Sequence, residues 1–260
     1  MSESIAFITA STEHGTMIVN RLDRCQSGER AWGVGYELLR DGAFSRHEVE
    51  LGVQLLAHRR RYFGDCVLAI DCGANIGVHT LAWSRAIRGW GDVLSIEAQE
   101  RIFYALCGNI AINNCFNARA VLAAVADFDG AIHVPSLNYQ QEASFGSLEL
   151  RASSRNEPIG QPVDYRNHRG TPVKALRLDS LDLARVDLIK LDIEGMEEEA
   201  LNGAQETIAK CAPILLIERI KSSLERLQAF TSAYRYESFG LGMNILAIHK
   251  DDPTLRHIKK

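Results

Sequence analysis

Residues 66–77, Cys-Val-Leu-Ala-Ile-Asp-Cys-Gly-Ala-Asn-Ile-Gly, predict a buried strand, a tight turn and the start of a helix. The apolar run 67–70 suits a strand that is buried on both faces, and a helical pattern covers 78–88. Gly73 and Gly77 let the backbone of the turn approach a ligand, and the first N–H groups of the helix point into the same space. The segment therefore predicts a nucleotide-binding site at the end of the first strand.

The spacing of this turn favours a nucleoside without phosphates. A dinucleotide fingerprint needs glycines in the pattern G-x-G-x-x-G, and Asn75 stands at the middle position. Asp71 would repel a phosphate, but it can accept a hydrogen bond from a cationic amino acid group. The next strand, 92–96, is followed by Glu97, which is placed to accept both hydroxyls of a ribose. The two acids predict S-adenosylmethionine as the ligand, and the chain then resembles a class I methyltransferase.

Composition and charge limit the function classes. The chain has 260 residues, of which 46% are hydrophobic and 24% charged, as in ordinary globular proteins. The net charge of −4 argues against a broad polyanion-binding surface, and we interpret the basic cluster 58–61 as a solvated helix end. The six cysteines form no C-x-x-C pair, so neither a zinc site nor a disulfide framework is expected. With no signal peptide and no long apolar run, we expect a cytoplasmic protein without a membrane span.

Strands that alternate with helices predict an α/β fold with a doubly wound, mostly parallel, seven-stranded Rossmann-like sheet. Further strands are expected at 120–125, 186–191 and 214–217, a helix at 197–210 and a closing edge strand at 244–249. We divide the chain into an N-terminal extension, 1–45, with strands or hairpins, and a class I methyltransferase domain, 46–260. Within that domain, 126–170 is predicted to be an irregular insert that faces the substrate.

Acidic residues follow several of these strands and should gather at one edge of the sheet. Besides Asp71 and Glu97 they include Asp127, and Ala126 before it is expected to contribute to the cofactor site. Asp192 follows the fourth strand in the same way.

The fourth strand and its turn, Leu188-Ile-Lys-Leu-Asp-Ile-Glu-Gly195, predict the acceptor side of the site. Lys190 lies inside a buried strand, so it should pair with a carboxylate. Asp192 or Glu194 could orient a hydroxyl or take its proton, and His79 is an alternative base. Both carboxylates could bind a cation, but no third ligand is evident, so no metal site is predicted.

These motifs together resemble the FkbM family of S-adenosylmethionine-dependent methyltransferases. The likeness rests on the segments 71–77 and 188–195, on Glu97, and on the pieces Ser144-Phe-Gly-Ser147 and Leu178-Asp-Ser-Leu181, and it covers roughly residues 45–250. It implies a class I fold and O-methylation of a sugar, polysaccharide or small-metabolite hydroxyl. It also implies that one set of residues holds the cofactor, Asp71, Gly73, Asn75, Gly77 and Glu97, and that another faces the acceptor, Lys190, Asp192 and Glu194.

Alternatives from other function classes stay open. The chain could be a cofactor-binding protein or pseudoenzyme without catalysis, or an NAD-type oxidoreductase, although Asn75 argues against the latter. Methylation of nucleobase amines is disfavoured, because an Asn/Asp-Pro-Pro-aromatic turn does not follow the fourth strand. The expected partner is a small-molecule or glycan acceptor; nucleic acid is not expected, and an oligomer is possible.

Overall fold

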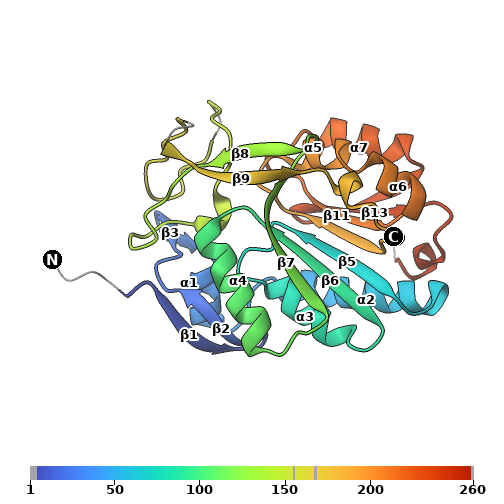
Figure 1. Cartoon of the computed structure of the whole chain (residues 1–260), viewed down its shortest axis with the longest axis horizontal. Coiled ribbons are helices and arrows are strands. Elements are labelled where there is room, and N and C mark those ends of the chain that lie inside the picture. The colour runs from blue at the N-terminus through green and yellow to red at the C-terminus, as the bar shows by residue number, and fades with distance from the viewer. Residues whose placement is uncertain (1–4, 155, 167–168, 259–260) are drawn as a thin grey trace.

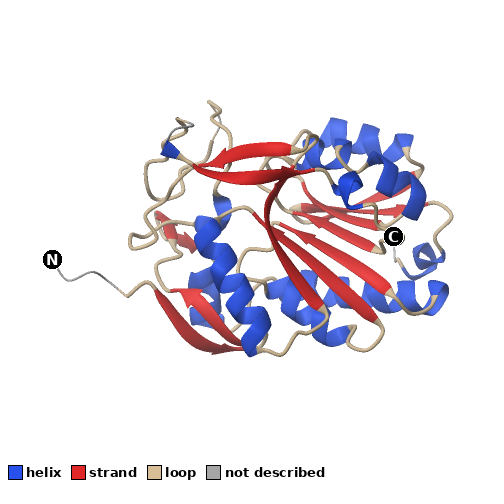
Figure 2. Ribbon diagram, in the orientation of Figure 1, coloured by secondary structure: helices blue, strands red, loops and turns tan. Residues whose placement is uncertain are grey.

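The computed structural model describes residues 5–154, 156–166 and 169–258, and within these residues nine strands form one central sheet. Figure 2 shows this sheet between helices that cover both of its faces. The strands follow one another across the sheet in the order β12-β13-β11-β10-β5-β6-β7-β9-β8. Their bounds are β5 Val67–Cys72, β6 Gly91–Glu97, β7 Ala118–Val125, β8 Gly130–Val134, β9 Thr171–Leu176, β10 Leu188–Leu191, β11 Ile214–Glu218, β12 Tyr236–Leu241 and β13 Asn244–His249.

The predicted mostly parallel α/β sheet is confirmed, but its strand count differs from seven. Neighbouring strands from β11 to β9 run parallel, whereas β13 is antiparallel to β11, and β8 is antiparallel to β9. The additional strands β8 and β9 extend the sheet beyond β7. The sequence prediction missed β9 because its half-exposed residues and Pro172 weaken the hydrophobic signal of a strand.

Two further boundaries differ from the prediction. The helix expected at 197–210 is divided into α5, Glu197–Asn202, and α6, Gln205–Cys211. Gly203 lies between them, and a Cβ there would come within 2.1 Å of the carbonyl oxygen of Ala126. The strand at 244–249 is not the edge, because β12 pairs with its outer side.

Helices enclose the sheet in two layers (Figure 1). One layer consists of α2, Arg46–Phe63, α3, Val78–Ala86, and α4, Glu100–Ile112, and the other of α5, α6 and α7, Leu224–Ala233. Trp83 is fully buried on the first side and Leu227 on the second. Among the described residues, no helix is long and apolar enough to cross a membrane.

The N-terminal segment packs against α4. It forms the hairpins β1, Phe7–Thr12, with β2, Gly15–Asn20, and β3, Cys25–Ser27, with β4, Arg30–Trp32, followed by the helix α1, Val34–Asp41. The side chain of Asn109 on α4 accepts the N–H of Ile18 and donates to the carbonyl oxygens of Ile18 and Ile76. Residues 7–32 therefore form two hairpins, and Gly33 and Gly35 lie at the start of α1.

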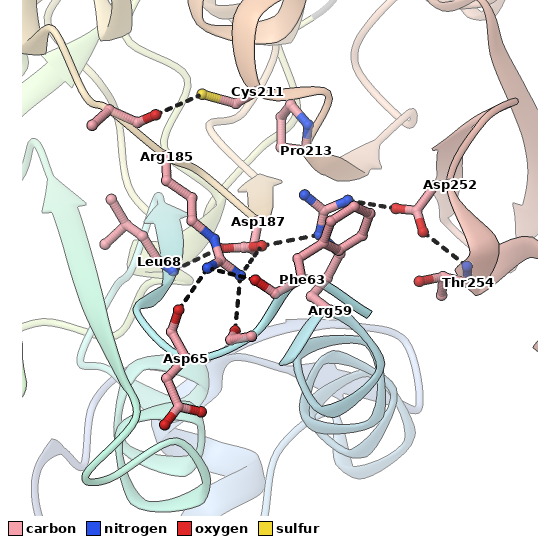
Figure 3. A network of polar contacts seen from close by, with 12 residues as sticks. Arg59, Phe63, Asp65, Leu68, Arg185, Asp187, Cys211, Pro213, Asp252 and Thr254 are labelled. Carbon is pink, nitrogen blue, oxygen red and sulfur yellow. Dashed lines mark hydrogen bonds and ion pairs between the residues drawn. The ribbon is translucent and has the colours of Figure 1, made fainter. Parts of the chain in front are cut away.

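A buried ion network lies where the parallel strand β10 begins, at the end of the sheet opposite to the carboxyl ends of the parallel strands (Figure 3). Asp187 precedes β10 and is fully buried, and it accepts hydrogen bonds from Arg59 at 3.0 Å and Arg185 at 2.8 Å. Arg59 also donates to Asp252 at 2.6 Å. The interpretation of the basic cluster as a solvated helix end is therefore wrong for Arg59. Its side chain is buried, because it points from α2 to the carboxylates of Asp187 and Asp252.

Candidate functional site

A cavity of about 580 Å³ opens where the central parallel strands end. This volume lies in the usual range for sites that bind small molecules, which is about 300–1,000 Å³. The turn after β5, the end of β6 and the loops after β10 and β11 contribute residues to the lining. These residues include Gly73, Ala74, Asn75, Glu97, Ala98, Gln99, Lys190, Asp192, Ile193, Glu194 and Glu218.

Glu97 forms the part of the lining that suits a ribose. Its carboxylate is 6% exposed and accepts the backbone N–H groups of Asn75 and Gln99 at 2.9 and 2.8 Å. Burial, partly offset by these hydrogen bonds, raises its pKa to about 7. Each carboxylate oxygen retains a further lone pair, so Glu97 can accept hydrogen bonds from two hydroxyl groups of a ligand.

Gly73 and Asn75 shape the turn beside Glu97. Gly73 has a φ of 74°, and a Cβ on it would lie 1.8 Å from the carbonyl oxygen of Asp192. Asn75 also adopts a left-handed conformation, with a φ of 49°. Only glycine at 73 lets the turn after β5 lie this close to the loop after β10, which brings the two halves of the cavity together.

Three residues predicted to hold the cofactor lie outside the lining of the cavity. Asp71 is fully buried, where it accepts a hydrogen bond from Thr80 at 2.7 Å. A Cβ on Gly77 would lie 2.7 Å from a methyl group of Leu106, so this glycine allows close packing against α4. Ala126 is also fully buried. These positions support the walls of the cavity.

Lys190 has the carboxylate partner that the sequence predicted. Its side chain is 3% exposed, and its ammonium group lies 2.9 Å from Asp192 and 3.8 Å from Asp71. Burial opposes the charged form, but these acids and Glu48 outweigh it and raise the pKa of Lys190. Lys190 is therefore a fixed positive charge that orients Asp192 at the cavity.

Glu194 faces a second lysine, which the sequence prediction missed. Glu194 has a φ of 57°, and its carboxylate lies 2.5 Å from the ammonium group of Lys221. The side chain of Lys221 is 9% exposed and also lies 3.8 Å from Glu149. Burial raises the pKa of Glu194, and Lys221 offsets part of that rise. A carboxylate with a raised pKa is suited to accepting a proton from a hydroxyl group.

Glu218, at the end of β11, is the third carboxylate of this cluster. Asp192, Glu194 and Glu218 each offer an oxygen, and these atoms lie within 4.8 Å of one another. Burial and the two neighbouring acids raise the pKa of Glu218. Three carboxylates could also hold a hard divalent cation, a ligand set that the sequence analysis left incomplete. An acid directly after a buried strand, the signal used for Asp71 and Glu97, would have revealed Glu218.

His79 lines the cavity beside a carboxylate from α2. Its Nε2 atom lies 3.0 Å from Glu48, which also accepts a hydrogen bond from Asn244 at 2.6 Å. Burial acts to raise the pKa of Glu48, but His79 and Lys190 outweigh it and lower the pKa to about 2. The imidazole is thus held by an ionised partner, and Glu48 was not predicted from the sequence.

The N-terminal segment and the insert complete the lining. Trp32 from β4 and the loop around η1, Phe145–Ser147, face the cavity. Buried Asp23 accepts the N–H groups of Gly35 and Phe145 at 2.8 and 3.0 Å and so joins these two segments. The N-terminal segment therefore contributes to the lining of the cavity, although no motif in residues 1–45 predicted this role.

Comparisons with known proteins point to methyl transfer. Residues 71–241 match the model of the methyltransferase FkbM domain. Methyltransferase 1 of Beauveria bassiana (strain ARSEF 2860) is 26% identical over 153 residues, which are 55% of this chain and 61% of that protein. A crystal structure of a methyltransferase FkbM from Methylobacillus flagellatus KT superposes with a TM-score of 0.50 at 17% identity, over 74% of this chain and 48% of the other. The chain thus spans about half to three fifths of the length of these relatives.

Proposed function

The chain belongs to the FkbM methyltransferase family, and we propose that it transfers a methyl group from S-adenosylmethionine to a hydroxyl group of a sugar, polysaccharide or small metabolite. One observation carries this proposal. Glu97, which can accept hydrogen bonds from ribose hydroxyls, lines the same cavity as a cluster of three carboxylates at the ends of β10 and β11, Asp192, Glu194 and Glu218.

The cofactor side of the cavity fits the ribose of an adenosine. Glu97 is a buried carboxylate, and one of its oxygens accepts the backbone N–H of Asn75 while the other accepts that of Gln99. Gly73 and Asn75 provide a left-handed turn beside it. When bound, S-adenosylmethionine would supply a methyl group attached to a positively charged sulfur.

The acceptor side provides a base and a fixed orienting group. Transfer to a hydroxyl forms an oxygen–carbon bond, breaks the carbon–sulfur bond and releases one proton. Glu194 accepts that proton in our proposal, because its pKa is raised and it borders the cavity. Asp192, held by Lys190 at 2.9 Å, orients the hydroxyl group.

Label transfer tests the proposal directly. The protein is incubated with tritiated S-adenosylmethionine and a panel of glycans, nucleosides, hydroxylated metabolites and proteins. Glu194→Gln should lower kcat by roughly 10²- to 10⁴-fold, the usual contribution of acid–base catalysis. Asp192→Asn, which disturbs the orientation of the hydroxyl group, should also lower kcat, and both variants should bind S-adenosylhomocysteine with little change in affinity. Asp182→Asn, which changes an exposed acid that does not line the cavity, is the matched control. If no acceptor takes up label although S-adenosylhomocysteine binds, the protein is a cofactor-binding pseudoenzyme.

Cofactor binding distinguishes the proposed methyltransferase from an oxidoreductase that uses NAD. S-adenosylhomocysteine should raise the melting temperature, whereas NAD at the same concentration should leave it unchanged. The reverse result would favour the oxidoreductase.

Replacing Lys221 by methionine should move the pH dependence of turnover. Glu194 works as a base only when ionised, so activity is present above its raised pKa and is lost as the pH falls through it. Without the nearby ammonium group the pKa of Glu194 rises further, and the acidic limb of kcat against pH should move up by about one unit or more. Lys210→Met, which removes an exposed lysine, is the control. An unmoved acidic limb would exclude Glu194 as the base.

A further inference from the structure

A second cavity, of about 800 Å³, adjoins the first beyond the loop after β10. The two cavities share six lining residues: Leu150, Glu157, Glu194, Met196, Ile220 and Lys221. The Glu194–Lys221 ion pair therefore stands at the junction between them. A molecule whose reacting hydroxyl lies beside Glu194 can continue directly into the second space.

The second cavity is lined mainly by charged and hydroxyl-bearing side chains. Apart from the shared residues, these include Glu149, Arg151, Ser153, Glu198, Ser222 and Arg226. Among the described lining residues no aromatic ring is available for stacking. This lining suits a ligand with many hydroxyl groups and is a poor match for a flat aromatic or a hydrocarbon group.

Each of the two arginines of this lining is paired with a carboxylate. Arg226 lies 3.2 Å from Glu198, and Arg151 lies 2.5 Å from Glu199. Because each guanidinium already faces a carboxylate, neither a strong anion nor a strong cation is favoured. A neutral hydroxyl group, in contrast, can donate to a carboxylate and accept from a guanidinium at once.

Exposure increases along the second cavity away from the junction. The side chains of Lys221 and Glu194 at the junction are 9% and 16% exposed, whereas those of Arg151 and Arg226 are 50% and 77% exposed. The cavity thus leads from the carboxylate cluster to solvent. An occupant can extend out of the protein at this end.

We propose that the second cavity binds the distal part of an extended, neutral polyhydroxylated acceptor, at least two sugar-sized units long. The unit that receives the methyl group lies beside Asp192 and Glu194, and the next unit lies between Arg151 and Arg226. This inference rests on the proposed function and assigns its acceptor class.

The test compares acceptors of different length. Tritiated S-adenosylmethionine is supplied with matched mono-, di- and trisaccharides, and with flat aromatic alcohols. We expect kcat/KM for a di- or trisaccharide acceptor to exceed that for the monosaccharide that carries the reacting hydroxyl by about tenfold or more. The monosaccharide lacks at least one hydrogen bond to a charged side chain that the longer acceptor makes. The double variant Arg151→Ala/Arg226→Ala should remove most of this advantage by raising KM, and should leave turnover of the monosaccharide unchanged.

Arg235→Ala, which removes an exposed, ion-paired arginine outside both cavities, is the matched control and should keep the preference for the longer acceptor. Equal kcat/KM for short and long acceptors, a preference for aromatic alcohols or an unaffected double variant would each overturn the second site while leaving methyl transfer intact. Absence of label from every acceptor class would instead overturn the proposed function, and this inference with it.

Discussion

Replacing Glu97 by glutamine is expected to weaken binding of S-adenosylhomocysteine by roughly 100- to 10,000-fold, because two hydrogen bonds to a charged carboxylate are worth about 1.5–3 kcal/mol each. The wild-type carboxylate has two equivalent oxygens, which accept the N–H groups of Asn75 and Gln99. An amide offers only one oxygen, so its NH₂ group would face a backbone N–H and disturb the turn as well.

Calorimetry with S-adenosylhomocysteine measures this loss, and circular dichroism checks that the variant is folded. Glu225→Gln, an exposed acid on α7, is the control and should bind normally. Wild-type affinity should also weaken as the pH falls from 8 to 6. Burial raises the pKa of Glu97 to about 7, and hydroxyl donors favour the ionised form, which is lost below that pKa. Unchanged affinity in the variant would remove Glu97 from the cofactor site.

The parts of the fold with dense apolar runs were predictable from the sequence. The strands β5, β6 and β10 and the acids that follow them depend on local patterns, and the structure brings Glu97, Asp192 and Glu194 to one cavity. Local sequence patterns did not predict strands that are only partly buried, or site residues whose partners are distant in the sequence. The strand β9 and the edge strand β12 both contain exposed residues, which gives them no clear hydrophobic pattern.

The missed parts of the site share a second cause. Lys221, Glu48 and Trp32 lie in separate segments of the chain, and each reaches the cavity only through tertiary packing. Their local sequences resemble those of ordinary surface positions. Asp71 shows the converse case, since the end of a strand was identified correctly, yet its side chain is turned into the wall, where it contacts Thr80.

Arg59 follows the same logic, because only long-range contacts distinguish it from its exposed neighbours. It joins α2 to Asp187 before β10 and to Asp252 near the C-terminal 3₁₀-helix, Pro253–His257 (Figure 3). Arg185 adds hydrogen bonds to Asp187 and to the carbonyl oxygens of the turn 63–65. One carboxylate therefore holds two arginines, and through them several segments that are distant in the sequence.

Replacing Asp187 by asparagine should lower the free energy of unfolding by about 3–5 kcal/mol, because removing one partner of a buried ion pair leaves uncompensated charge. Urea denaturation monitored by circular dichroism measures the change. As a comparison, Asp65→Asn breaks an exposed ion pair with Arg60, which lies on α2 next to Arg59. This variant should lower the free energy of unfolding by about 1 kcal/mol or less. Neither residue lines the cavity, so affinity for S-adenosylhomocysteine should be unchanged while the variants remain folded. Similar losses of stability in both variants would show that the network contributes no more than a surface ion pair does.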